Sequence, residues 1–192
     1  MNNLKNYFNY NIRPNMILKL NNKNIMEIPK MNKVILNIGF SNVNKNKNNL
    51  LEPMLALELI SSQKSKLIKA KKSISTFNLR QGVYTACKVT LCKNNLYDFI
   101  TRINKTVFPN IQEFKGLPIN SFDLQGNYSF SVDNLIIFPE IEFLHELFNK
   151  KIGMNVTMNI NSKDKKNSII LLSGLQMPFS QPKNEIFTNK RQ

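Results

Sequence analysis

A strict alternation of apolar and polar residues constrains this chain more than any other feature. It is clearest near the C-terminal end, where the two kinds of side chain take turns in the order Met154, Asn155, Val156, Thr157, Met158, Asn159, Ile160 and Asn161. Successive side chains of a strand point to opposite faces of a sheet. The segment is therefore predicted to be a strand with one apolar face and one polar face.

The same alternation recurs in residues 127–132 and 83–91. In the second of these segments Cys87, Val89 and Leu91 share one face, which leaves Tyr84, Lys88 and Thr90 on the other. The compact β-branched run at 33–40 is also predicted to be a strand, and residues 66–70 are predicted to form a short one.

Helical spacing of apolar residues predicts four helices, over 6–20, 49–61, 94–108 and 164–172. Three of them have a residue that can accept the first free backbone N–H groups. These expected caps are Asn48 or Asn49, Asn94 or Asn95, and Asp164, and Gly174 is expected to close the last helix.

Prolines mark further expected boundaries, because proline lacks the backbone N–H that helices and strands need. Pro14 is expected to end or kink the first helix, and Pro109 to lie just past the end of the third. Pro139 interrupts the apolar segment 135–141, which is therefore predicted to be an edge strand or a packed loop.

Together these elements predict an α+β fold. Antiparallel strands would form one sheet, helices would pack on its apolar face, and a long basic loop at 71–82 would join two of the strands. Residues 1–180 are expected to form a single domain, and 181–192 a polar C-terminal tail. The uncovered polar face would be free to meet a partner.

The charge distribution predicts which kind of partner. The chain has 27 Lys and Arg against 12 Asp and Glu, a net charge of +15. Residues 61–93 contain many of the cations and no acidic residue. Such a surface favours binding of a polyanion, and nucleic acid is favoured over a membrane because no apolar stretch is long enough to cross one.

This basic stretch supplies the chemistry of nucleic-acid binding. Lys64, Lys66 and Lys69 can neutralise phosphates, and Arg80 offers a planar guanidinium. Phe77 and Tyr84 can stack on bases if they are exposed.

The residues that enzymes and metal sites require are scarce. His145 is the single histidine, and Cys87 and Cys92 lie five positions apart, on opposite faces of the same predicted strand. Neither the P-loop motif nor the dinucleotide-binding glycine motif is present. Glu140, Glu142 and Glu146 form an acidic cluster, which is interpreted as a solvated face. No catalytic residue, metal or cofactor is predicted, and the two cysteines suit a reducing compartment.

Seven motifs give the chain a family resemblance. They are IKAKKS (68–73), FNLRQG (77–82), ACKVTL (86–91), EFKGL (113–117), SFDLQGNYS (121–129), IIFPEI (136–141) and GMNVT (153–157). In order and spacing they resemble the universal large-subunit ribosomal protein L5 in its bacterial and organellar form, from about residue 4 to residue 179. One motif alone would be weak, whereas seven in register are specific.

The resemblance implies an α+β fold on the central protuberance of the large subunit. It implies contacts with 5S rRNA, where the ribosome contains one, and with neighbouring large-subunit rRNA and proteins. Positions matching the family's 5S rRNA contacts are Asn37, Gln63, Lys88 and Thr90. The residue pattern alone favours a solvent-facing position on a half-buried strand for Asn37, and the resemblance makes it a candidate contact.

The family's loop between its two central strands reaches toward the peptidyl-site tRNA. The matching residues here are Lys71, Lys72, Ser73, Asn78, Arg80 and Gln81. A further surface of such proteins bridges to a small-subunit head protein of the S thirteen family. The leading hypothesis is thus a non-catalytic ribosomal protein, and the alternative is a free RNA-binding regulator or a small RNA-modifying enzyme.

The sequence departs from the family pattern at several places. Cys92 replaces an arginine after KVTL, Lys115 replaces one in EFKGL, and Leu124–Gln125 replace Gly-Arg before GNYS. Each change removes a guanidinium, which binds phosphate in a bidentate way. The segment 143–150 is also altered.

Composition bears on the compartment. The abundance of Asn, Lys and Ile indicates an AT-rich, organelle-encoded gene, with the mitochondrial matrix favoured over the plastid. The first twenty residues lack the apolar core of a signal peptide and the Arg and Ser richness of a transit peptide, so they are expected to belong to the mature protein.

Overall fold

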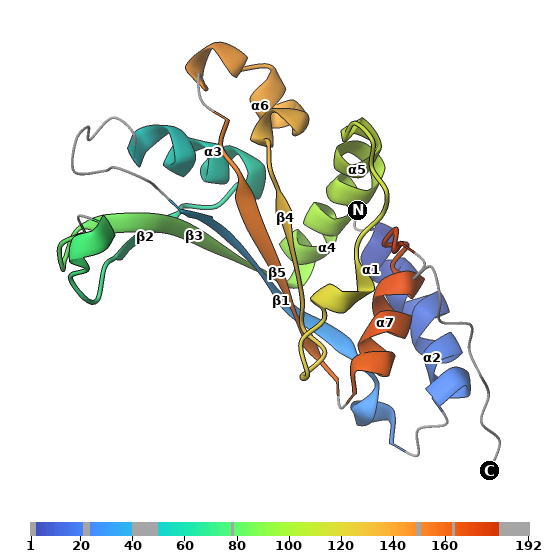
Figure 1. Ribbon diagram of the computed structural model, residues 1–192. Helices are drawn as coiled ribbons and strands as arrows, with labels where there is room; N and C mark the ends of the chain where they lie inside the picture. The colour runs from blue at the N-terminus through green and yellow to red at the C-terminus, as the bar shows by residue number, and fades with distance from the viewer. Residues whose placement is uncertain are drawn as a thin grey trace.

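The computed structural model describes residues 3–20, 24–39, 50–77, 79–148, 151–162 and 164–180. Its centre is one antiparallel sheet with the strand order β2-β3-β1-β5-β4 (Figure 1). The strands are β1 (Lys30–Gly39), β2 (Lys66–Lys69), β3 (Tyr84–Cys92), β4 (Tyr128–Val132) and β5 (Met154–Asn161). The predicted strands at 33–40, 66–70, 83–91, 127–132 and 154–161 are therefore confirmed to within three residues at their ends.

The helices gather on one side of this sheet (Figure 1). They are α1 (Asn3–Tyr7), α2 (Arg13–Leu20), α3 (Leu51–Ser61), α4 (Lys93–Arg102), α5 (Phe108–Asn110), α6 (Pro139–Glu142) and α7 (Lys165–Gly174). The arrangement confirms the predicted α+β class, an antiparallel sheet with helices packed on it.

Alternation along the strands decides which side the helices cover. Val34, Leu36 and Ile38 of β1 are fully buried, as are Val156 and Met158 of β5. The intervening residues of these strands are half-buried or exposed. The buried set belongs to one hydrophobic core that also includes Leu57 of α3, Ile100 of α4 and Leu171 of α7. The opposite face of the sheet carries mainly polar side chains.

Two prolines lie inside helical segments, and each follows a wider turn. A π-helical turn at Phe8–Ile12 ends two residues before Pro14, and another at Ile103–Val107 ends two residues before Pro109. Proline has no N–H to donate to the hydrogen bonds of a helix, and its ring crowds the carbonyl four residues earlier. A π turn relieves both problems. The prediction that Pro109 lies past the end of the helix is wrong, because α5 continues to Asn110.

The segment 135–141 forms no strand. A 3-10 turn at Leu135–Ile137 leads into α6, where Pro139 occupies the first position. At that position a missing N–H costs nothing. Leu135, Phe138 and Ile141 are buried, so a packed loop describes the segment and an edge strand does not.

The predicted helix boundaries were less accurate than the helices themselves. Leu50 precedes α3 and Cys92 precedes α4, and neither side chain caps its helix. Asp164 precedes α7 as predicted, but its side chain makes no capping hydrogen bond. Gly174 lies within α7, where a Cβ would stand 3.1 Å from a side-chain carbon of Ile12. Asn48, Asn49 and the predicted tail 181–192 lie outside the described residues.

Alanine substitutions at three glycines can distinguish the cost of backbone strain from the cost of steric crowding. Gly126 has a φ of +79°, and a Cβ there would lie 2.3 Å from Ser168 Oγ. Gly82 has a φ of +86° with open space around it, and Gly39 has neither constraint. We expect Gly126→Ala to lower the free energy of unfolding by roughly 3 kcal/mol, Gly82→Ala by about 1 kcal/mol, and Gly39→Ala by less than about 0.5 kcal/mol.

Urea titration of the three single variants measures this order. Equal losses for Gly126→Ala and Gly82→Ala would show that the serines move aside and that only the backbone conformation matters.

Candidate nucleic-acid interface

The open face of the sheet carries a continuous polar row across all five strands. The row follows from the register: Lys66 lies opposite Lys88, Lys88 opposite Asn37, Asn37 opposite Asn155, and Asn155 opposite Ser131. Directly opposed residues point to the same face. Three residues predicted separately as rRNA contacts, Asn37, Lys66 and Lys88, are thus side by side.

Two parallel rows extend this surface. Thr90, Ile35, Thr157 and Ser129 form the second, and Cys92, Lys33 and Asn159 the third. Ser129 donates to Thr157 across the strands at 3.2 Å, and Asn159 donates to Asn127 at 3.0 Å. The predicted contact Thr90 therefore lies one row away from Asn37. We call these three rows the polar sheet face.

The electrostatics of the polar sheet face are one-sided. Its charged members are Lys33, Lys66 and Lys88, and none of the residues in the three rows is acidic. Lys66 and Lys88 stand directly opposite each other on neighbouring strands. Like charges in this position destabilise a sheet. An anion between them removes that cost, so the pair favours binding of phosphate.

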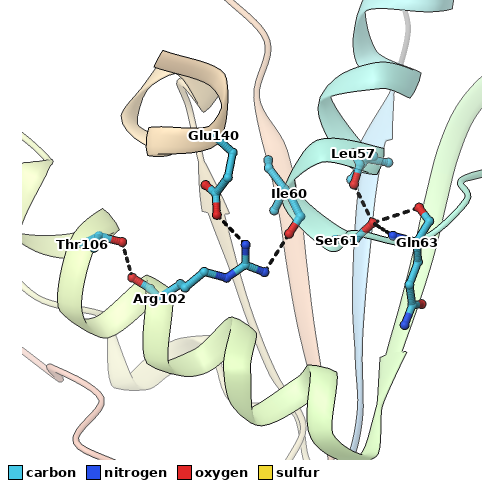
Figure 2. A network of polar contacts seen from close by, with 7 residues as sticks. All are labelled: Leu57, Ile60, Ser61, Gln63, Arg102, Thr106 and Glu140. Carbon is cyan, nitrogen blue, oxygen red and sulfur yellow. Dashed lines mark hydrogen bonds and ion pairs between the residues drawn. The ribbon is translucent and has the colours of Figure 1, made fainter. Parts of the chain in front are cut away.

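Gln63 and Lys64 lie in the turn between α3 and β2, next to the first cation of the row. Ser62 has a left-handed φ of +52°, which turns the chain at the end of α3. The Ser61 hydroxyl donates to the Leu57 carbonyl at 2.6 Å and accepts the Gln63 backbone N–H at 3.2 Å. In Figure 2 the Gln63 side-chain amide extends away from this network.

A second set of contacts holds the same turn from its far end. The Glu58 carboxylate accepts both the backbone N–H of Ser65, at 3.0 Å, and its hydroxyl, at 3.1 Å. Because Glu58 is one turn back on α3, the helix end and the start of β2 are tied together. The backbone that carries Gln63 and Lys64 is therefore fixed before any ligand arrives.

Arg102 connects this region to α6, and nothing in the sequence pointed to it. Its guanidinium donates to the Ile60 carbonyl at 2.7 Å and forms an ion pair with Glu140 (Figure 2). Glu140 was predicted as part of a solvated acidic face. The structure instead gives it a partner on α4, and the pair joins three helices at one end of the sheet.

The predicted basic loop between β2 and β3 is more regular than its sequence indicates. Ile74 and Leu79 exchange backbone hydrogen bonds of 2.9 and 3.0 Å, and Gly82 N–H donates to the Ala70 carbonyl at 3.0 Å. The Ser73 hydroxyl accepts the Gln81 N–H at 2.9 Å. This hairpin extension, residues 70–83, projects away from the helical layer (Figure 1). We call it the basic finger.

Cations and one aromatic ring are exposed on the basic finger. Lys71, Lys72, Ser73, Arg80 and Gln81 are all exposed, and Phe77 near the tip is 77% exposed. Asn78, also predicted as a tRNA contact, lies outside the described residues. At the base of the finger the Lys69 ammonium stands 5.3 Å from the centroid of the Tyr84 ring, which engages that ring in a cation–π contact.

The two cysteines face opposite sides of β3, as predicted. Cys87 is buried in the core and Cys92 is exposed on the polar sheet face. Burial in the core raises the pKa of the Cys87 thiol to about 12. It likewise raises the pKa of the Tyr128 hydroxyl to about 12. The structure therefore shows a structural thiol and a separate surface thiol.

The remaining polar chemistry of the described residues is sparse. Within them no group of three or more His, Cys, Asp or Glu side chains is placed to hold a metal ion. Nor is any described helix long and apolar enough to cross a membrane. His145 is exposed, with its ring Nδ1 3.3 Å from the Glu142 carbonyl oxygen.

Comparison with known families assigns a class to this fold. A profile described as ribosomal protein L5 matches residues 24–80, and a second, which describes the C-terminus of the same ribosomal family, matches residues 84–179. The two matches run from just before β1 to beyond α7. They place the chain among the ribosomal proteins.

Individual relatives make the assignment specific. The large ribosomal subunit protein uL5m of Reclinomonas americana is 40% identical over 181 residues, which is 94% of this chain and 100% of that protein. The uL5 protein of Fusobacterium nucleatum is 40% identical over 88% of this chain and 91% of its own length, and that of Moorella thermoacetica 38% over 93% and 98%. The chain belongs to the uL5 family of large ribosomal subunit proteins.

Residue patterns located the polar sheet face only in part. Lys33, Asn155, Thr157 and Asn159 belong to it, and the sequence singled out none of them as a site residue. Alternation shows that they share a face of their own strand. It does not show which strands are neighbours, and the register supplies that information.

The thiols provide a chemical test of the two faces of β3. We expect one thiol, that of Cys92, to react with a disulfide reagent at pH 8 in the folded protein, because the raised pKa of Cys87 leaves almost no thiolate. Until urea unfolds the chain, Cys87 should react at least roughly 100-fold more slowly than Cys92. Cys92→Ser is the control and should remove the fast phase. Two fast thiols in the native protein would contradict the burial.

The same thiol sets a direction for pH dependence. The folded state holds the Cys87 proton more tightly than the unfolded chain, whose thiol has a pKa near 9.0. Its contribution to stability is therefore complete below pH 9 and is lost as the pH rises toward 12.

Proposed function

We propose that this chain is a non-catalytic constituent of the large ribosomal subunit that binds rRNA through its polar sheet face. One observation carries the proposal: three cations, two of them directly opposed, lie on an open face whose three rows contain no carboxylate. Cations that neutralise phosphates supply most of the affinity of such interfaces. Asn and Thr side chains between them can donate to, and accept from, ribose and base edges.

The proposed rRNA contacts are Asn37, Gln63, Lys64, Lys66, Lys69, Lys88 and Thr90. Lys66 and Lys88 would neutralise phosphates, while Asn37 and Thr90 would hydrogen-bond between them. Gln63 and Lys64 would extend the contact past the end of β2. Following the family, the RNA would be 5S rRNA, where the ribosome has one, and adjacent large-subunit rRNA at the central protuberance.

The basic finger is proposed to reach the peptidyl-site tRNA. Lys71, Lys72 and Arg80 would meet its phosphates, and Ser73 and Gln81 would keep the two arms of the finger paired. The finger projects from the sheet on a hydrogen-bonded stem, so it can contact a second RNA while the sheet face holds the first. Asn78 completes the proposed tRNA set.

Further proposals concern the assembly as a whole. Residues 1–180 would act as one domain, with neighbouring large-subunit proteins and a small-subunit head protein of the S thirteen family as partners. The uL5m relative and the Asn- and Lys-rich composition support a mitochondrial ribosome. A bacterial relative has the same sequence identity to this chain, so identity alone does not assign a compartment.

The rRNA proposal predicts the effect of reversing the opposed cations. Lys66→Glu with Lys88→Glu should weaken binding to large-subunit rRNA at least roughly 100-fold at low salt and reduce the slope of log K against log salt by about two, one for each lost phosphate contact. Filter binding over a salt series measures both quantities.

A matched pair on the helical side controls for net charge. Lys105→Glu with Lys166→Glu makes the same change in total charge at two exposed positions away from the polar sheet face. It should leave the salt slope nearly unchanged. Equal losses for the two pairs would mean that affinity follows overall charge, and the polar sheet face would lose its assigned role.

The finger makes a different prediction. Lys71→Glu with Lys72→Glu should lower peptidyl-site tRNA occupancy of assembled ribosomes several-fold and leave the yield of large subunits unchanged, because these side chains lie on the projecting hairpin. The tRNA occupancy and the yield of large subunits can both be measured on tight-coupled ribosomes from cells that carry the variant. A loss of assembly with normal tRNA occupancy would overturn the assignment.

A free RNA-binding regulator or a small RNA-modifying enzyme is the alternative. Fractionation on a sucrose gradient separates the two classes, since a ribosomal constituent must co-sediment with large subunits. Recovery of the chain only as a free monomer would reject the proposed function.

A further inference from the structure

The outer edge of β4 is the part of the sheet that the ribosomal function leaves unexplained. β4 is the last strand in the order, so one side of its backbone has no neighbouring strand. At its start the Asn127 carbonyl accepts the Asp123 N–H on that outer side at 2.8 Å. Outward and inward peptide groups alternate along a strand. Ser129 and Ser131 therefore turn their backbone groups outward.

Ser131 is the outward residue that is left without a backbone partner among the described residues. The hairpin at 122–128 reaches only the beginning of β4, through the bridge between Phe122 and Tyr128. No backbone hydrogen bond from Ser131 to any described residue outside the ladder with β5 is present. An unpaired strand edge of this kind is a template for another strand.

A groove of about 700 Å³ runs along this edge. Phe130 and Val132 from the core side of β4 line it, and so do Ser129 and Ser131 from the open side, where it continues onto Asn155 and Thr157 of β5. Residues from both faces of one strand can line the same groove only if the groove follows the strand's edge. Its far wall is the segment 111–121, which includes Phe114, stacked on Phe108 with ring centroids 5.0 Å apart.

The lining favours a peptide of particular charge. Most of the wall is apolar, from Ile111, Leu117, Pro118 and Ile137, and Asp133 is its one charged side chain among the described residues. The Asp133 carboxylate would repel a phosphate backbone, and negative side chains are the minority in a chain of net charge +15. The groove therefore suits a cationic polypeptide better than RNA. The same net charge opposes pairing of two copies through this edge.

We propose that the groove receives an extended, Lys- or Arg-bearing segment of a neighbouring protein, which adds a sixth strand beside β4. Main-chain hydrogen bonds to Ser131 would supply register and affinity, as in other strand additions. Alternate side chains would enter the apolar wall near Phe114, and a cation would meet Asp133. The occupant is a protein of the assembled subunit, so the inference rests on the proposed function. The groove shares Ser129, Ser131, Asn155 and Thr157 with the polar sheet face, but its lining includes none of the three cations on which the rRNA proposal depends.

A photocrosslinker in the groove wall tests the proposal in assembled subunits. With p-benzoylphenylalanine in place of Phe114, irradiation of purified large subunits followed by mass spectrometry should give an adduct with a Lys- or Arg-containing segment of another protein. An adduct with rRNA, an adduct with a second copy of this chain, or no adduct at all would overturn the proposal.

Two variants at one position test the strand pairing itself. Ser131→Pro removes the outward N–H, a change that edge strands tolerate, and should lower the adduct yield at least about fivefold. Ser131→Ala retains the N–H and should leave the yield unchanged. Equal yields from the two variants would reject strand addition.

Hydrogen exchange covers the case in which Ser131→Pro fails to fold. In the unaltered protein, the Ser131 amide should exchange at least about tenfold more slowly in the subunit than in the free chain. An unchanged rate would overturn the proposal. The two proposals can fail separately. Retained rRNA binding without the adduct would reject this inference alone, and an adduct without rRNA binding would reject the proposed function alone.

Discussion

The central position of β1 is the constraint on which the rest of the structure depends. β1 pairs with β3 through seven residues on one side and with β5 on the other, and its apolar residues are buried beneath the helices. Because side chains alternate, the same pairing aligns the polar residues of all five strands in rows. Core and candidate interface are thus two faces of one ladder, and a slip of one residue would exchange them.

This arrangement explains why unfavourable charge is tolerated. Lys66 and Lys88 oppose each other on an open surface with no carboxylate in the surrounding rows, which costs stability in the free chain. The hydrogen bonds of Ser61, Glu58 and Arg102 fix the adjoining turn in the free chain, so the proposed binding of RNA would require little further ordering of this turn. Rigidity and excess charge both favour a polyanion partner.

The two ends of the sheet differ in what they offer a partner. At the β2 end the hairpin continues into a basic finger with an exposed aromatic ring. At the β4 end the edge is open, apolar and marked by an aspartate. The cationic end suits RNA, whereas the other end suits a basic polypeptide. Under the two proposals above, a single sheet would join RNA and protein in one assembly.

Sequence by itself determined the fold class, the five strands and the basic character of residues 61–93, because alternation and charge are local properties that neighbours in the chain reveal. It also carried the family motifs. Tertiary structure alone decided that Lys66, Lys88 and Asn37 stand in one row, that Arg102 binds Glu140, and that Pro109 stays within a helix. Register and ion pairing depend on residues distant in the chain, and the spacing of apolar residues does not show where a π turn admits a proline into a helix.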